Sequence, residues 1–156
     1  MVRYKSGGRV EIGIFLLDVY CLGVKNAAFN QCQEDELPEM FDRLFQGVSP
    51  NEYSGEWGRK LVEGAAAYAR SLGFAPHRDY KKGARVMGGI DPKKCSETFV
   101  YGMNGKPTFI AGPNDDNARC DLIMKVLFKK FGTHEFDYLH PITPELEENL
   151  TIGMAE

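Results

Sequence analysis

The 156 residues include 43% apolar and 26% charged side chains, proportions that are ordinary for a soluble globular protein. A formal net charge of −3 argues against a protein that binds nucleic acid through its overall charge, and no apolar run approaches the roughly 20 residues of a membrane-spanning helix. We therefore expect a single globular domain over residues 1–140, an acidic flexible tail over residues 141–156, and a cytoplasmic location.

The strongest strand pattern runs from Val10 to Val24, where apolar residues occupy both faces. A run of about 15 residues exceeds the usual length of a strand, so we expect a bend or break at Asp18 or Gly23. Two arrangements fit the pattern: a central strand covered on both faces, or a hairpin whose turn lies near Asp18. The stretch from Asn26 to Asp35 is expected to be a loop.

Two helices are predicted next. Glu36 to Phe45 carries apolar residues at helical spacing and has Pro38 in its first turn. Ser49 to Gly73 is the longest helix pattern, with Ser49 as its N-cap and Gly73 as its left-handed end. We expect this second helix to be scaffold packed on the sheet, so that function lies in the loops. Its apolar and small residues recur every three or four positions, at Tyr53, Trp57, Leu61, Gly64, Tyr68 and Leu72.

Shorter elements complete the chain. Lys81 to Met87 is expected to form one or two helical turns, and Thr98 to Ala111 has the pattern of a hairpin around an Asn-Gly type I′ turn. A helix with its buried face between Cys120 and Phe131 follows, and Phe136 to Leu139 is a candidate edge strand. The pattern predicts an α+β fold, a two-layer sandwich of a mainly antiparallel sheet with about three helices packed against it.

No motif of cofactor or catalytic chemistry is present. The chain lacks the GxGxxG and phosphate-loop patterns of nucleotide binding and the GxSxG, HExxH and SxxK signatures of hydrolases. The cysteines form no CxxC pair and no Cys/His pair at metal-ligand spacing, so we expect reduced thiols, no cofactor and no metal. The four cysteines are Cys21, Cys32, Cys95 and Cys120.

Acidic residues stand where the apolar pattern is interrupted. Asp18 lies inside the first strand pattern, and a buried carboxylate is costly unless it is paired or hydrogen-bonded. It fits either a catalytic or ligand-binding acid paired with Lys25, or a residue at a strand break that accepts hydrogen bonds from backbone N–H groups. Asn114, Asp115 and Asp116 precede the last helix, where we expect them to cap it rather than to bind an anion.

His77 and Asp79 lie in the loop after the longest helix, and a His–carboxylate pair can serve general acid–base catalysis. The same two residues are also common turn formers. Together with Asp18 they define a hydrolase or nuclease hypothesis. A metal site would need a further ligand such as His134 or His140.

Charge is distributed unevenly along the chain. From His77 to Lys94, the basic segment, six basic residues stand against two acidic ones, whereas Gln33 to Asp42 contains five acids and no base. The basic segment fits a docking surface for an acidic protein partner, or a small patch for phosphate or nucleic acid. Its candidate binding residues are Arg78, Tyr80, Lys81, Lys82 and Arg85.

Several segments resemble one family of uncharacterised bacterial proteins. They are GIFLLDVYCLGVKNAAF, KLVEGAAAYARSLGFAPHRDY, YGMNGKPTFIAGPNDD and a closing aromatic strand like FDYL, and they cover most of Gly8 to Leu139. The resemblance implies a bacterial cytoplasmic protein and, for a chain this short, an accessory subunit. It also suggests a small companion protein of a bacterial defence operon, such as a type III CRISPR locus. The resemblance implies little about chemistry.

The leading hypothesis is a non-enzymatic binding or regulatory protein that acts through protein–protein contacts, without a cofactor and away from membranes. One alternative is a small hydrolase or nuclease that uses Asp18, His77 and Asp79. The other is a nucleic-acid-binding accessory that uses the basic segment. The enzyme hypothesis requires the three side chains to converge in one pocket, and the nucleic-acid hypothesis requires a steep salt dependence of binding.

Overall fold

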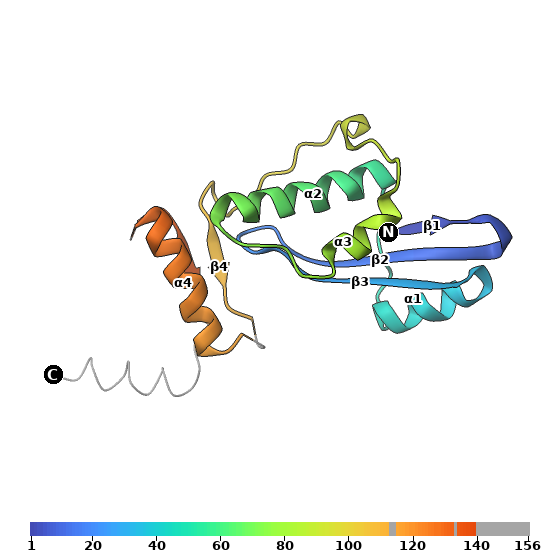
Figure 1. Ribbon diagram of the computed structural model, residues 1–156, viewed down its shortest axis with the longest axis horizontal. Helices are drawn as coiled ribbons and strands as arrows, with labels where there is room; N and C mark the ends of the chain where they lie inside the picture. Colours follow the sequence, from blue (N-terminus) through green and yellow to red (C-terminus); the bar gives the residue numbers. More distant parts are fainter. Residues whose placement is uncertain (113–114, 133, 140–156) are drawn as a thin grey trace. The chain divides into compact units, whose positions relative to one another are not determined.

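Figure 1 shows the fold in a computed structural model. The chain divides into two compact units, Met1–Tyr101 and Gly102–Glu156, where the sequence predicted one domain over residues 1–140. The α+β class is confirmed: an antiparallel sheet with helices packed against it forms the first unit, and the described part of the second contains a small parallel sheet and a helix. The structure describes residues 1–112, 115–132 and 134–139.

A three-stranded antiparallel sheet organises the first unit, in the order β1 (Val2–Tyr4), β2 (Arg9–Asp18), β3 (Gly23–Gln33). The short 3₁₀ turn η1 (Ser6–Gly8) joins β1 to β2. β2 and β3 form a hairpin, so the hairpin arrangement is confirmed and the single central strand is wrong. The loop expected over residues 26–35 is also wrong, because β3 continues through most of it. Many of its side chains are polar because β3 is an outer strand of the sheet.

One face of this sheet is covered by α2 (Gly55–Leu72), α3 (Tyr80–Gly83) and the 3₁₀ turn η3 (Ala84–Met87), as Figure 1 shows. The helical turns predicted over Lys81 to Met87 are therefore confirmed. The end of α3 can approach β2 closely because Gly13 has no side chain, and a Cβ there would lie 2.8 Å from the Gly83 carbonyl oxygen. The buried residues of this core are Val24, Ala27, Val62, Ala66 and Met87.

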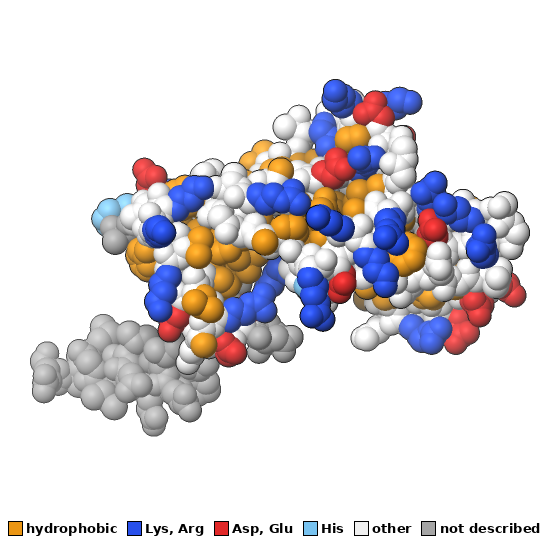
Figure 2. Space-filling view, viewed as in Figure 1, with side chains coloured by type: hydrophobic (Ala, Val, Ile, Leu, Met, Phe, Trp, Pro, Cys, Tyr) orange, Lys and Arg blue, Asp and Glu red, His pale blue; other side chains and the backbone are white. Residues whose placement is uncertain are grey.

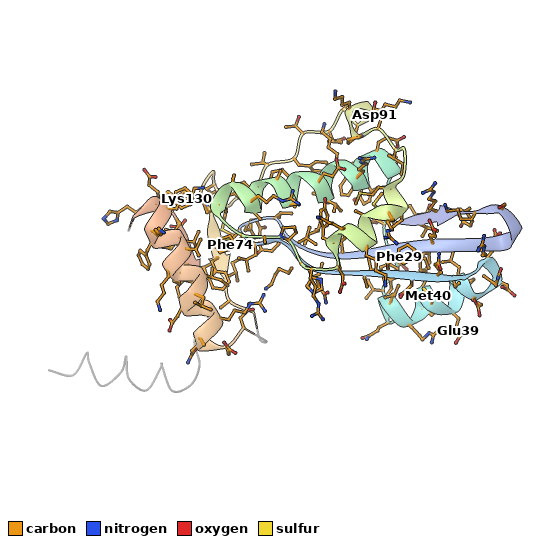
Figure 3. The ribbon with its side chains drawn as sticks, viewed as in Figure 1. Phe29, Glu39, Met40, Phe74, Asp91 and Lys130 are labelled. Carbon is orange, nitrogen blue, oxygen red and sulfur yellow. The ribbon has the colours of Figure 1, made fainter. Side chains whose placement is uncertain are left out.

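The opposite face is covered at one end by α1 (Leu37–Phe45), which follows the 3₁₀ turn η2 (Glu34–Glu36). The helix predicted over Glu36 to Phe45 is thus confirmed. Figure 3 shows Met40 on the side of α1 nearest the strands and Glu39 on the far side. Helices therefore lie on both faces of the sheet. The residues that pack between α1 and the strands are Val10, Ile12, Leu37, Met40 and Phe41.

α2 begins later than the sequence pattern predicts. Ser54 is the N-cap, because its Oγ accepts a hydrogen bond from the Trp57 N–H (3.2 Å), and the expected cap at Ser49 is wrong. The predicted end is confirmed, since Gly73 has a left-handed φ of 104°. The start was mispredicted because α1 and α2 pack on opposite faces, so the residues between them connect the two faces in a non-helical conformation.

The aromatic residues of α2 pack against a different segment from its small residues. Trp57 meets Phe99 edge-to-face with ring centroids 5.1 Å apart, and Tyr68 stacks on Tyr101 at 5.7 Å. Phe99 and Tyr101 belong to the irregular segment that follows the 3₁₀ turn η4 (Pro92–Lys94). The helix packs on the sheet as predicted, but it does so through its small residues. The face predicted to lie on the sheet, with Trp57 and Tyr68, packs instead on residues 99–101. The residues of α2 that are buried are Val62, Ala65, Ala66, Ala69 and Leu72.

The second unit contains a strand–helix–strand arrangement: β4 (Thr108–Ile110), α4 (Asn117–Phe131) and β5 (Asp137–Leu139). β4 and β5 are parallel, and Phe109 stacks on Tyr138 with ring centroids 5.5 Å apart. The predicted last helix and the short strand after it are confirmed. The tail predicted over residues 141–156 lies outside the described residues.

The hairpin predicted over Thr98 to Ala111 is confirmed only at its turn. Asn104 and Gly105 have positive φ values of 52° and 81°, and Met103 and Lys106 form one bridge across them. The Met103 and Lys106 backbones exchange both of their hydrogen bonds, and the antiparallel ladder extends no further than this bridge. β4 pairs instead with β5, so the predicted antiparallel pairing is wrong.

Candidate functional site

Asp18 is the acceptor that shapes the β2–β3 turn. Its Oδ1 accepts hydrogen bonds from the N–H groups of Tyr20 (2.9 Å) and Cys21 (3.0 Å), and its Oδ2 accepts one from Leu22 (3.1 Å). The carboxylate thus satisfies three successive backbone donors at the point where the strand pattern breaks. This geometry is that of a structural residue.

Cys21 lies fully buried in the same turn. Burial, together with the nearby charge of Asp18, raises the pKa of the Cys21 thiol to about 12. A thiol that stays protonated at neutral pH is a poor nucleophile, so Cys21 is unsuited to covalent catalysis.

This burial has a measurable consequence. In the folded protein at pH 8, iodoacetamide should modify the partly exposed Cys32 well before Cys21, and Cys21 should react only after unfolding. Peptide mass spectrometry over a time course measures both rates. Equal rates in the native protein would contradict the buried turn, and denatured protein provides the fully reactive control.

His77 and Asp79 form the turn that leads into α3. The His77 N–H donates to the Val24 carbonyl (2.9 Å), which ties this loop to β3, and the Tyr80 N–H donates back to the His77 carbonyl (2.9 Å). The imidazole Nδ1 accepts a hydrogen bond from the Asp79 N–H (3.3 Å) and lies 3.8 Å from the Asp79 Oδ2. Both residues therefore have clear structural roles.

Asp18 makes no direct contact of these kinds with His77 or Asp79, the other two residues of the hydrolase hypothesis. Among the described residues, no hydrogen bond or ion pair links Asp18 to His77 or to Asp79. No group of three or more His, Cys, Asp and Glu side chains in the described part of the chain is placed to hold a metal ion. His134 belongs to the second unit, and His140 lies outside the described residues.

The acids before the last helix act as predicted for a cap. The Asp116 Oδ1 accepts a hydrogen bond from the Arg119 N–H (2.7 Å). Asp115 closes the preceding loop by accepting from the Gly112 N–H (2.9 Å), and its other oxygen pairs with the Arg119 guanidinium (3.2 Å). Asn114 lies outside the described residues.

The clearest surface feature is a row of exposed cations that begins in the turn before α3 and continues along α3 and η3. Arg78, Lys81, Lys82 and Arg85, which we name the basic stripe, are spaced as on one face of a helix. All four are exposed, and Arg78 has 89% of its side-chain surface in contact with solvent. Figure 2 shows Lys and Arg side chains spread over the region of α3 and β1, with few acids among them.

The opposite side of the same turns is fixed to the core. Gly83, Val86 and Met87 are buried, and the Tyr80 ring packs edge-to-face on Phe15 with centroids 6.3 Å apart. Burial raises the pKa of the Tyr80 hydroxyl, and the Arg70 guanidinium lies 5.7 Å from the centre of its ring. Tyr80 therefore anchors the basic stripe rather than extending it.

Sequence reasoning missed two groups of residues near the stripe. Arg3 of β1 donates to the Arg85 carbonyl (3.4 Å), so a further cation lies beside the stripe. Arg59 of α2 donates to the carbonyls of Gly88 (3.0 Å) and Ile90 (2.6 Å). These contacts join segments far apart in the chain, and no local pattern indicates them.

Lys60, also on α2, holds the next part of the loop. Its ammonium donates to the carbonyls of Cys95 (2.8 Å) and Glu97 (2.6 Å). Arg59 and Lys60 together therefore fasten the segment after η3 to α2. The basic stripe is presented by a surface that is tied down on several sides.

Comparisons with protein-family models, with curated proteins and with solved structures found no match for this chain. None of the helices in the described residues is long and apolar enough to cross a membrane.

Proposed function

We propose that this protein is a non-enzymatic binding protein that docks on an acidic surface of another protein through the basic stripe. One observation carries the proposal: four exposed cations lie at helical spacing on turns whose other side is anchored in the core. Because the turns that carry the cations are anchored, docking orders the side chains but not the backbone, which favours a specific complex.

The energetics require several contacts at once. An exposed ion pair contributes roughly 0.2–1 kcal/mol, so a single cation does not make a complex. Arg78 and Arg85 can each bind a carboxylate through two parallel hydrogen bonds, whereas Lys81 and Lys82 act as point charges. Complementary charge also speeds the encounter with an acidic partner and disfavours basic ones.

We further propose a setting, which rests on the resemblance of the sequence to uncharacterised bacterial proteins. In that setting the chain is a small accessory subunit of a bacterial cytoplasmic complex. A defence locus such as type III CRISPR is the candidate context. The same stripe offers a surface for nucleic acid, and the experiment below separates the two kinds of partner.

The test is a comparison of two triple variants. Lys81→Gln, Lys82→Gln and Arg85→Gln together remove three charges from the stripe, whereas Lys93→Gln, Lys94→Gln and Lys125→Gln remove three exposed charges elsewhere. Quantitative mass spectrometry of pull-downs from the source organism should find a protein retained by the wild type and by the second variant. The stripe variant should retain at least about tenfold less of this protein than the wild type does.

Treatment of the lysate with nuclease distinguishes the partner class. Retention that survives nuclease and falls only with the stripe variant supports the proposal. Retention abolished by nuclease, with binding to single- or double-stranded probes that falls steeply with salt, would establish the nucleic-acid alternative. Equal losses in both triple variants would show that net charge, and not the stripe, governs binding.

A further inference from the structure

A second surface lies on the other face of the sheet, where α1 ends. The apolar positions of α1 recur at residues 37, 40, 41, 44 and 45, one face of a helix. Leu37 is buried, and Met40 and Phe41 are half-buried against β2, but Leu44 and Phe45 are 41% and 38% exposed. The apolar stripe of α1 therefore continues beyond the core that covers its first half.

The chain after α1 turns back over this exposed end. Gln46 and Gly47 have positive φ values of 48° and 82°, and the Val48 N–H donates to the Phe45 carbonyl (2.9 Å). This turn places Val48, which is 69% exposed, next to the end of the helix. The result is an apolar rim that faces solvent.

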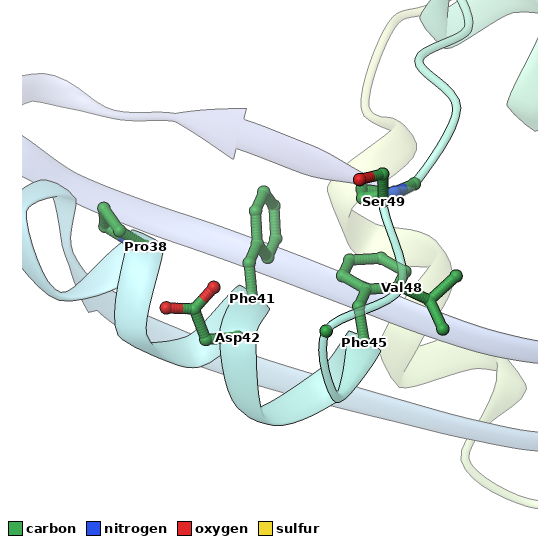
Figure 4. A pocket seen from close by; sticks show the side chains of 8 residues that line it. Pro38, Phe41, Asp42, Phe45, Val48 and Ser49 are labelled. Carbon is green, nitrogen blue, oxygen red and sulfur yellow. The ribbon is translucent and has the colours of Figure 1, made fainter.

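A pocket of about 360 Å³ lies between the helix and this turn, which we name the α1 pocket. This volume is at the lower end of the range for binding pockets, enough for one large side chain and its neighbours. Figure 4 shows the Phe41 and Phe45 rings and Val48 along it, with the Asp42 carboxylate between Pro38 and Phe41. Its lining residues are Pro38, Phe41, Asp42, Phe45, Gly47, Val48, Ser49 and Pro50.

The α1 helix, which lines the pocket, and the turn before it are acidic. Residues 34–42 contain five exposed carboxylates, and Arg43, which follows them in the chain, lies 3.8 Å from Glu39. Among the ion pairs of the described residues none involves Asp42. A pocket with apolar side chains and one carboxylate in its lining, on an acidic segment of the chain, suits an apolar side chain flanked by cations.

We propose that the α1 pocket binds a basic segment of a partner protein, which inserts one apolar side chain between Phe41, Phe45 and Val48 while its Lys or Arg residues meet Asp42 and the neighbouring acids. A second copy using the same surface is disfavoured, because two-fold pairing would set like charges against each other. This surface is separate from the basic stripe, so the proposal does not depend on the function proposed above.

The probe is a fluorescent 16-residue amphipathic peptide with leucines every three or four positions and lysines between them; a matched peptide carries glutamates instead. We expect the full chain to bind the lysine peptide at least about tenfold more tightly than the glutamate peptide in fluorescence polarisation. Val48→Lys should weaken binding at least about tenfold, and Asp42→Asn about threefold or more.

Val100→Lys is the matched control, because Val100 is another exposed valine of the same unit (77%) and should leave binding unchanged. Both valines are mostly exposed, so neither variant should unfold the protein. Equal binding of the two peptides, or equal losses with Val48→Lys and Val100→Lys, would overturn the proposal. Light scattering that shows a dimer dispersed by Val48→Lys would overturn it in favour of self-association.

Discussion

Replacing Gly23 with alanine is expected to lower the free energy of unfolding by about 3 kcal/mol or more, the largest effect of any change described for this protein. Gly23 has a φ of +67°, a conformation that costs a residue with a side chain about 1 kcal/mol. An added Cβ would also lie 2.6 Å from the Ala65 carbonyl oxygen and from the Ala69 Cβ. Both atoms belong to buried alanines of α2, so the helix would have to move away from the β2–β3 turn to make room for the added Cβ.

Two further glycine variants separate these causes. Gly47 also has a positive φ (+82°) but open space around it, so Gly47→Ala should cost only about 1 kcal/mol. Gly89 has neither constraint, and Gly89→Ala should change stability by less than about 0.5 kcal/mol. Urea unfolding followed by Trp57 fluorescence measures all three. If Gly23→Ala is no worse than Gly47→Ala, α2 does not lie against this turn.

The second large effect is expected for Asp18→Ala. The substitution removes the acceptor of three backbone N–H groups, and we expect a loss of about 2–3 kcal/mol. The stability of Asp18→Asn should lie between those of the wild type and Asp18→Ala, because the carboxamide has one acceptor oxygen in place of two. Thermal unfolding of the variants, measured at the same pH, gives the ranking.

Asp91→Ala is the control for this prediction. The Asp91 Oδ1 accepts one exposed hydrogen bond, from the Lys93 N–H (3.0 Å), so its loss should cost less than about 1 kcal/mol. An Asp18→Asn protein with unchanged stability that had lost partner binding or a measurable hydrolytic activity would contradict the structural role. That result would support the hypothesis in which Asp18 is a catalytic or ligand-binding acid.

Local signals in the sequence were sufficient for several elements. Gly73 and Gly132 end the helices predicted before them, and the Asn-Gly pair gives the predicted turn. These features depend on the conformational preferences of a few adjacent residues. The α+β class followed from the same signals, because a strand-rich start is followed by a run of helices, as it is in the structure.

Signals that depend on packing were left open or misread. Periodicity left two arrangements open for Val10 to Val24, and the hairpin is the one observed, because Asp18 accepts the hydrogen bonds of the reversal. β4 pairs with β5 across the whole length of α4, which no local pattern indicates. Ser49 and Ser54 are equally good N-caps by residue type, and only the packing of α1 on the opposite face decides between them.

In the candidate site, too, some features follow from the local sequence and others depend on tertiary packing. The basic segment was visible as a count of charges, but its organisation into one stripe follows from Tyr80, Gly83 and Met87 facing the core. The contacts of Arg59 and Lys60 and the α1 pocket depend on tertiary structure, so composition gave no sign of them.

Photo-crosslinking in the source organism tests the central claim, that the basic stripe is the surface on which a partner docks. Benzoylphenylalanine in place of Lys82 should form a crosslink to a protein that mass spectrometry identifies, while the same group in place of Lys125 on α4 should not capture that protein. The crosslink should disappear when Lys81 and Arg85 are also changed to Gln. A crosslink at position 125 and none at position 82 would contradict the account.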